Sequence, residues 1–455
     1  MEELELYSEN IINRGQTLLK KGTSPLRRVF TMNHTISKEL IHFIESSPSC
    51  FHAVKFTEDL LLKDHFTQLQ ENEKWQIQRG GRYFVARNGS ALIAFTVPEQ
   101  SFSGMRIIAG HSDSPSFKIK ENPELETEKH YIRLNVEGYG GMLCAPWFDR
   151  PLSVAGRVII KNKKTGKFES WLVNIDRDLV MIPSLAIHMN RDANKGYSYN
   201  IQKDMLPLYG GISAKGTFLK ITADAAGVKE NEILGHDLFL YNRQKGCIWG
   251  ASQEYISSPR LDDLQCAFAS LKGFLSAPRK SYLAVYCILD NEETGSNTKQ
   301  GAASTFLYDT LTRAYRGLGM TEEDYLVHLA DSFMISADNA HAVHPNYTDK
   351  ADPSNRPFLN EGIVIKFNAG QKYCTDALSA AMFRDICREA GVPVQTFANR
   401  SDMAGGSTLG NISNTRVALN TVDIGLPQLA MHSPYETAGT KDTGYLIKAA
   451  EKFFL

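Results

Sequence analysis

The sequence has no excess of charge of either sign and no long apolar run. Lys and Arg together number 50 against 51 Asp and Glu. Such a balance gives no basic surface for nucleic acid or for an anionic membrane. No stretch reaches the roughly 18 apolar residues that cross a bilayer. We therefore expect a protein that binds neither nucleic acid nor membrane.

The N-terminal segment MEELELYSENIINRGQTLLKKG lacks the apolar core of a secretory signal. The spacing of its Leu and Ile residues indicates a short amphipathic helix. Residues 1–32 are interpreted as an extension, as a packing arm or as a segment upstream of an alternative start at Met32. The sequence leaves these three open.

Cysteines are few and unpaired in pattern. There are seven, an odd number, they are scattered, and none forms a CxxC motif. This pattern predicts buried, reduced thiols, and neither a disulfide framework nor a thiolate metal site. It is typical of a cytoplasmic protein.

The chain has 455 residues, 42% of them hydrophobic, which favours two domains. Short alternating segments between about 130 and 255 predict strands, namely YIRLNVEG, RVIIKN, FESWLVNI and TFLKITA. Strands and helices alternate on either side of this block. We therefore expect an α/β domain of residues 1–115 and 257–455, with a mixed central sheet flanked by helices. A β-rich domain of residues 116–256 would be inserted in it.

Local patterns predict the individual elements. Apolar spacing favours one helix over 34–60, and Asn88-Gly89 favours a hairpin over 83–97. Further along the chain we expect strands at 106–110, 282–290, 332–337 and 362–367, and helices at 262–277, 301–316, 376–391 and 443–454.

Acidic and His side chains follow the ends of several predicted strands. Taken singly, each such group is typical of a turn or a solvated face, and Asp262-Asp263 is typical of a helix N-terminus. Open α/β sheets, however, place ligands beyond the carboxyl ends of their strands. We therefore expect these side chains to converge: His111, Asp113, Glu292, Glu293, Asp338 and His432.

Two His residues with several carboxylates suit a divalent cation, zinc first, with manganese or cobalt as alternatives. Two ions need a carboxylate between them, and one of two adjacent glutamates is then free to act as a base. No G-x-S-x-G motif supports a serine hydrolase, and GGSTLG lacks the lysine of a phosphate-binding loop. Its glycines instead predict close backbone approach to a substrate, with Ser407 and Thr408 opening a helix.

Eight segments, in order along the chain, carry a resemblance to a known family. They are GHSDSPSFKIK (110–120), WFDRPL (147–152), SLAIHMNR (184–191), SPRLDD (258–263), DNEETGSNTKQGA (290–302), HAVHPNY (341–347), SDMAGGSTLG (401–410) and TVDIGLPQLAMHS (421–433). The sequence resembles the aspartyl aminopeptidase/aminopeptidase I family of dinuclear zinc exopeptidases. The resemblance extends over most of residues 34–455.

The resemblance implies the role of each site residue. Asp262 would bridge the two metals, His111 and Asp338 would complete one of them, and Glu293 and His432 would complete the other. Glu292 would be the general base. His188 would reach the scissile carbonyl of a neighbouring subunit, through an inserted domain that dimerises and helps to build a tetrahedral dodecamer.

Peptides are the implied substrates, with acidic N-terminal residues favoured, and the substrate contacts are assigned to His344, Lys366, Gly406 and Ser407. Two departures bear on this assignment. Asp263 stands where the family commonly has Asn, and GYGGMLCAPWFDRPL lacks the bulkier, more polar pattern of aspartyl aminopeptidases. A broad or neutral-preferring aminopeptidase, a deacylase, a carboxypeptidase and a self-assembling shell with a non-catalytic metal site are the alternatives.

Overall fold

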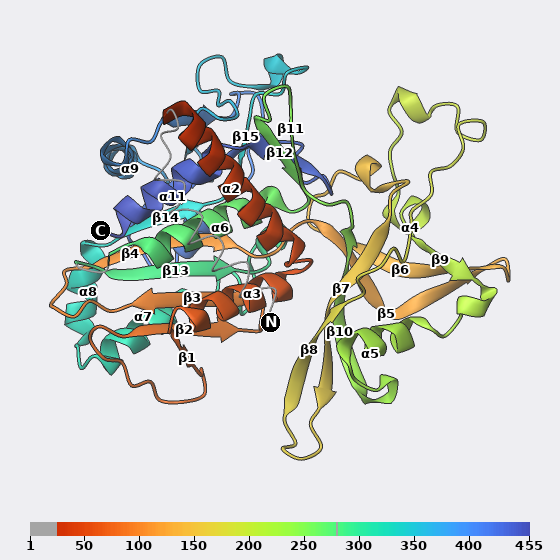
Figure 1. Cartoon of the computed structure of the whole chain (residues 1–455), viewed down its shortest axis with the longest axis horizontal. Coiled ribbons are helices and arrows are strands. Elements are labelled where there is room, and N and C mark those ends of the chain that lie inside the picture. The colour runs from red at the N-terminus through yellow and green to blue at the C-terminus, as the bar shows by residue number, and fades with distance from the viewer. Residues whose placement is uncertain (1–24, 279–280) are drawn as a thin grey trace.

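The computed structural model describes residues 25–278 and 281–455 (Figure 1). The helix expected within the first 22 residues lies outside these ranges. Within them, no helix has both the length and the apolar character needed to span a bilayer.

A mixed nine-stranded sheet, here called the central sheet, forms the middle of the larger half of the molecule. Its order is β1 (Thr67–Leu69), β2 (Arg82–Arg87), β3 (Ala91–Thr96), β13 (Leu283–Leu289), β4 (Met105–His111), β14 (Phe333–Ala337), β18 (Asn420–Gly425), β16 (Ile363–Phe367) and β17 (Val394–Ala398). The four inner strands β13, β4, β14 and β18 are parallel. β2 and β3 pair antiparallel around Asn88-Gly89, which confirms the predicted hairpin.

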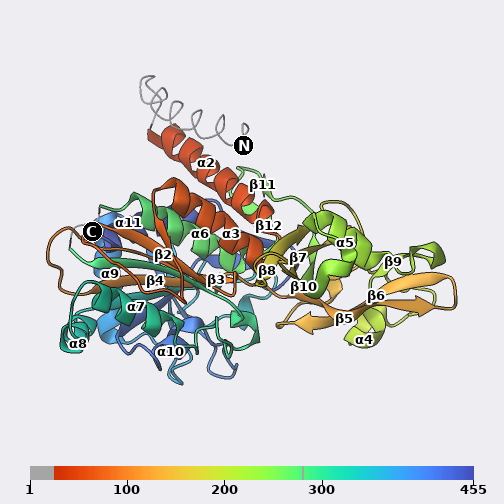
Figure 2. The same cartoon turned by 90° about the horizontal axis from the view of Figure 1, so that it is seen from below.

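Helices cover both faces of the central sheet (Figure 2). One face packs against α3 (Cys50–Lys63), α6 (Leu261–Ser276), α9 (Ala377–Ala390) and α11 (Asp442–Phe453). The other packs against α7 (Phe306–Gly317), α8 (Glu322–Ala330) and α10 (Leu409–Ser413). Alternate residues of β13 enter the two cores, as the two-residue period of a strand requires. The expected flanked mixed sheet is thereby confirmed.

A second sheet, here called the inserted sheet, consists of strands that lie between β4 and β11 in the chain. Its order is β8 (Phe168–Asn174), β7 (Leu152–Lys161), β10 (Ile233–Asn242), β5 (Ser116–Thr127), β6 (Tyr131–Tyr139) and β9 (Leu208–Gly211). The sheet has its own apolar core, against which α5 (Phe218–Ala226) packs, and α4 (Ile201–Asp204) precedes β9. Figure 1 shows it beside the central sheet.

A small sheet joins distant parts of the chain, in the order β11 (Cys247–Trp249), β12 (Tyr255–Ser258), β20 (Glu436–Gly439), β19 (Pro427–Leu429) and β15 (Ala340–His341). β12 pairs with the C-terminal strand β20, and β11 pairs with β12, so these two strands join the small sheet although residues up to 256 were expected within the insertion.

Two local predictions were wrong. The helix expected over 34–60 is two helices, α2 (Pro25–Glu45) and α3, because the segment Ser46–Ser49 turns the chain between them. Pro48 disfavours helical backbone at the residue before it. The segment TFLKITA, expected as a strand, begins α5, because the side chains of Phe218, Thr222, Ala223 and Ala226 are buried at helical spacing.

Candidate metal centre

Three of the four inner parallel strands deliver side chains to one edge of the central sheet. His111 is the last residue of β4, Asp338 directly follows β14, and Glu292 and Glu293 lie in the short helical turn after β13. β13 and β14 flank β4 on its two sides. These four side chains therefore meet at the carboxyl ends of neighbouring strands, as open α/β sheets place their ligands.

Asp262 enters the same place from the start of α6. Its Oδ1 lies 3.6 Å from Nε2 of His111, and its Oδ2 lies 3.5 Å from Nε2 of His432. His432 lies beyond the end of β19 and also places Nε2 3.4 Å from Oε2 of Glu293. Asp262 thus stands between two clusters that are far apart in the sequence.

The donor atoms gather in three overlapping groups, within each of which they lie within 4.8 Å of one another. The groups are His111, Asp262, Asp263 and Asp338; His111, Glu292 and Glu293; and Asp262, Glu293 and His432. Two ligands at about 2.0–2.1 Å from a tetrahedral zinc ion lie about 3.3 Å apart. The separations of 3.4–3.8 Å between His nitrogens and carboxylate oxygens are close to this spacing.

Buried carboxylate oxygens also fit a cation. Among the described residues of this cluster, Oδ1 of Asp262, Oδ1 of Asp263 and Oε1 of Glu293 are buried without a hydrogen-bond partner. Burying an acceptor oxygen without a hydrogen-bond partner costs free energy, and a buried carboxylate needs a counter-charge or a metal ion beside it. The residues present therefore fit a divalent metal ion.

Both imidazoles are held by backbone carbonyls at Nδ1. Nδ1 of His111 lies 3.1 Å from the carbonyl oxygen of Asp113, and Nδ1 of His432 lies 2.7 Å from that of Gly141. Each carbonyl favours the tautomer with the proton on Nδ1, which leaves Nε2 free as a metal ligand.

Glu436 is part of the centre and was missed by the sequence analysis. Its Oε2 accepts the backbone N–H of Asp262 at 3.0 Å, and its Oε1 accepts that of His432 at 2.8 Å. The side chain therefore ties together two elements that carry candidate ligands. A lone carboxylate at the head of the otherwise small, uncharged strand ETAG is the signal that marks it.

The electrostatics of the cluster are those of crowded carboxylates. Although burial opposes it, the imidazoles of His111 and His432, whose Nε2 atoms lie 3.6 and 3.5 Å from its two oxygens, hold the pKa of Asp262 well below its ordinary value. Burial, and then the nearby charge of Asp262, raises the pKa of Glu293. Burial also raises the pKa of Glu292, to about 8, although His111 opposes this.

Asp263 and Lys366 contact proposed metal ligands: Asp263 contacts His111, and Lys366 contacts Asp338. Oδ2 of Asp263 accepts the backbone N–H of His111 at 3.1 Å. The Lys366 ammonium is buried, donates to the carbonyl oxygen of Asn339 at 2.8 Å and lies 3.5 Å from Oδ2 of Asp338. Binding of an acidic substrate side chain by Lys366 stays a prediction.

The remaining predicted residues lie outside the three groups of donor atoms. His188 is exposed in the connection between β8 and α4. His344 is half-buried, and its Nδ1 accepts the backbone N–H of Asn346. Gly406 and Ser407 are exposed just before α10, where Ser407 donates to Asn411. Their proposed roles stay predictions.

Known proteins resemble this chain over nearly its whole length. The family model described as "Aminopeptidase I zinc metalloprotease (M18)" matches residues 43–454. A "Probable M18 family aminopeptidase 2" of Clostridium acetobutylicum is 49% identical over 424 residues, which are 92% of this chain and 98% of that protein.

Solved structures agree with these sequence matches. The cryo-EM structure of the Ape4 and Nbr1 complex matches with a TM-score of 0.90 at 34% identity, over 93% of this chain and 86% of that one. The S. cerevisiae mApe1 dodecamer matches with a TM-score of 0.81 at 29% identity, over 92% and 96% of the two chains.

The protein is thus of the α/β metallopeptidase class, with its candidate metal site at the strand ends of a mixed sheet. The chain belongs to the aminopeptidase I zinc metalloprotease (M18) family, and it is a metallo-hydrolase that acts on peptides. The resemblance drawn from the eight sequence segments is confirmed.

Proposed function

We propose that this protein is a two-metal aminopeptidase that releases N-terminal residues from peptides, with Asp and Glu favoured. One observation carries the proposal: the two carboxylate oxygens of Asp262 face two different imidazoles, at 3.6 and 3.5 Å. A carboxylate between two His-containing clusters is what a pair of ions about 3.5–4 Å apart requires.

The ligand sets follow from that observation. His111 and Asp338 would hold one ion with Asp262, and Glu293 and His432 would hold the other. Zinc is the metal proposed, because imidazole and carboxylate ligands without thiolate suit it, as they also suit manganese or cobalt. Bound zinc supplies a Lewis acid for the scissile carbonyl and lowers the pKa of a water molecule towards neutrality.

Glu292 is proposed as the general base. Its side chain groups with His111 and Glu293. It is absent from the other two groups of donor atoms, both of which contain Asp262. Glu292 would take a proton from the attacking water and deliver it to the leaving amine. That role requires a carboxylate within hydrogen-bond reach of the water. Nearby cations favour the ionised carboxylate and would lower its pKa from about 8.

Assembly is the second part of the proposal. Residues 116–256 would form a dimerisation domain, and copies of the chain would assemble into a tetrahedral dodecamer, as the S. cerevisiae mApe1 dodecamer supports for a relative. His188 would then enter the site of a neighbouring subunit and stabilise the oxyanion. Its exposed position on the inserted segment supports such a role, and so do the exposed apolar side chains of Leu185, Ile187 and Met189 beside it.

A substrate panel tests the proposal. Aminoacyl-anilides of Asp, Glu, Leu and Lys are compared with N-acyl amino acids, and bound metal is counted per chain. We expect two ions per chain and the highest kcat/KM for Asp or Glu. A preference for Leu would overturn acidic specificity alone. Turnover only of N-acyl substrates would overturn the aminopeptidase assignment, and one ion per chain would overturn the two-metal site.

A further inference from the structure

The last residue of β6 and the turn after it contact Glu293 and His432 of the candidate metal centre directly, and reach the centre a third time through Asp113. They belong to the inserted sheet, whereas the proposed ligands come from the central sheet, α6 and the segment after β19. Nothing in the proposed function gives this segment, Tyr139–Gly141, a part in the chemistry.

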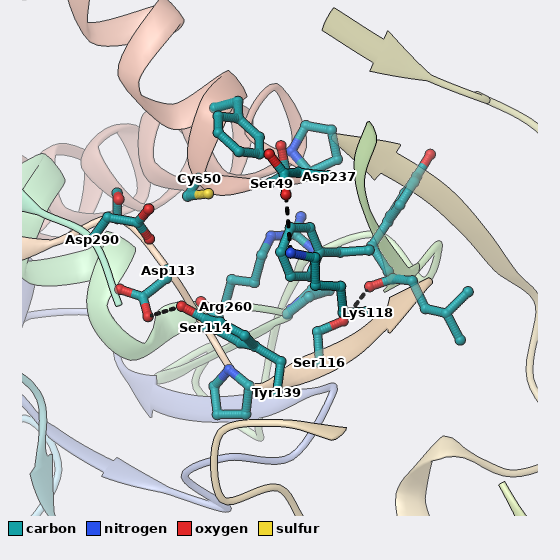
Figure 3. A pocket seen from close by; sticks show the side chains of 18 of the residues that line it. Ser49, Cys50, Asp113, Ser114, Ser116, Lys118, Tyr139, Asp237, Arg260 and Asp290 are labelled. Atoms are coloured by element: carbon teal, nitrogen blue, oxygen red, sulfur yellow. Dashed lines mark hydrogen bonds and ion pairs between the residues drawn. The ribbon is translucent and has the colours of Figure 1, made fainter. Parts of the chain in front are cut away.

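The first contact is a pair of hydrogen bonds at the phenol of Tyr139. The hydroxyl donates to Oδ2 of Asp113 at 2.7 Å, a dashed line in Figure 3, and accepts from Nδ2 of Asn291 at 2.9 Å. Its ring packs edge-on against Phe239 of β10, which fixes its direction. Tyr139 and Asp113 both line a cavity of about 140 Å³ between the two sheets.

Asp113 passes this constraint on to the centre. Its carbonyl oxygen faces Nδ1 of His111 at 3.1 Å, and its carboxylate accepts the backbone N–H groups of Glu292 and Glu293, each at 3.2 Å. The Asp113 carboxylate accepts hydrogen bonds from a phenol and from two backbone amides on its two oxygens, and these three bonds hold the side chain in one orientation.

The second and third contacts are made by the glycines. Gly140 has a φ of +76°, and a Cβ atom there would lie 3.0 Å from Cβ of Glu293. Only glycine adopts this backbone region readily and allows such an approach. The carbonyl of Gly141 then meets Nδ1 of His432 at 2.7 Å.

We infer that the segment Tyr139–Gly141 is a positioning element through which the inserted sheet orients both halves of the metal centre within one chain. Through Asp113, Tyr139 orients His111, a proposed ligand of one ion, and the turn that carries Glu292. Gly141 orients His432, a proposed ligand of the other ion. The inference rests on the proposed ligand set. It gives the inserted sheet a part in metal binding that is separate from any part in assembly.

Tyr139→Phe in the full-length protein tests the inference, with Tyr209→Phe as its matched control. Tyr209 is also on the inserted sheet, and its hydroxyl makes a hydrogen bond to Oγ1 of Thr217 at 2.8 Å, away from the centre. Metal-free proteins are titrated with Co²⁺, and the visible absorption, kcat, KM and Tm are measured.

We expect Tyr139→Phe to weaken Co²⁺ binding and lower kcat, each about 10–100-fold, with KM nearly unchanged and an altered cobalt spectrum. Tyr209→Phe should change only Tm. Gly140→Ala should resemble Tyr139→Phe, which keeps the test valid if one variant does not fold. Equal Co²⁺ affinity, spectrum and kcat in the wild type and both tyrosine variants would overturn the inference. If the wild type binds Co²⁺ but cleaves no peptide, the proposed function fails while the Co²⁺ comparison still decides the positioning role.

Discussion

Oδ1 of Asp113 accepts the backbone N–H of Glu292 at 3.2 Å. The same carboxylate accepts the next N–H, that of Glu293, through Oδ2. One buried side chain thus sets the path of the turn that carries both the proposed base and a proposed ligand.

Asp113→Asn is expected to weaken both metal binding and turnover, each by about 10–100-fold. An amide has a single acceptor oxygen, so in either orientation its NH₂ group would face the backbone N–H of Glu292 or that of Glu293. Metal content after dialysis and kcat measure the effect. Asp224→Asn, on an exposed position of α5, is the control and should match the wild type. Full metal content and full kcat in Asp113→Asn would contradict the role.

Glu292→Gln should keep both metals and lose about 10²–10⁴-fold in kcat, because a neutral amide cannot accept the proton of water. The readouts are kcat and metals per chain, with the exposed Glu121→Gln as control. Near-normal turnover would remove Glu292 as the base.

Asp262→Asn and Asp263→Asn form a matched pair. Asp262 faces both imidazoles and Asn would weaken both sites, whereas the amide oxygen of an Asn at 263 can still accept the N–H of His111. We expect metal loss only in the first variant, by elemental analysis. Zinc should also stabilise the metal-free wild type, by about 2.7 kcal/mol at 100 times Kd, but not Asp262→Asn. Equal metal content in the two variants would reject the bridging role of Asp262.

His188→Phe should lower kcat strongly with assembly intact, as judged by kcat and by size-exclusion chromatography with light scattering. Co-expression of the His188→Phe chain with a Glu292→Gln chain then tests whether His188 acts in the active site of a neighbouring subunit. Randomly paired reciprocal dimers would regain about a quarter of all sites intact. Absence of recovery in proven mixed oligomers would place His188 outside the partner's site.

Asp237 joins strands of the inserted sheet, accepting from Nζ of Lys118 and from Nε of Arg157, each at 2.9 Å. Burial opposes its ionisation, but the two cations outweigh burial and lower its pKa. Its stabilising contribution is therefore present above the unfolded pKa of about 3.9 and is lost as the pH falls through the lower folded value.

Asp237→Asn should thus lower the free energy of unfolding at pH 7 by about 1.5–3 kcal/mol and have a smaller effect at pH 3. Tm at the two pH values measures this, with the exposed Asp192→Asn as control. A Tm difference that grows as the pH falls would contradict the sign.

Strand ends were predictable because they depend on local patterns. The apolar run before His111 and the run before Glu292 each end at a polar residue, and the geometry of parallel strands brings such ends together. The same local logic failed at 34–60, where apolar spacing continued across Ser46–Ser49 although the chain turns there.

Contacts between distant segments were not predictable in this way. Tyr139, at the end of β6, is 26 residues from Asp113, in the loop between β4 and β5, and Glu436 is 174 residues from Asp262. No local pattern records which carboxylate meets which backbone N–H, because the tertiary arrangement decides it. The family resemblance supplied the bridging role of Asp262, but it did not include Glu436.

The placement of the inserted sheet has a consequence for biosynthesis. All six of its strands lie in the continuous range 116–242, so the ribosome finishes them before it makes α6, β14 or β19. Domains generally fold as units during synthesis, N-terminal ones first. The Tyr139–Gly141 turn can therefore be in place, as a template, before Asp262, Asp338 and finally His432 emerge to meet it.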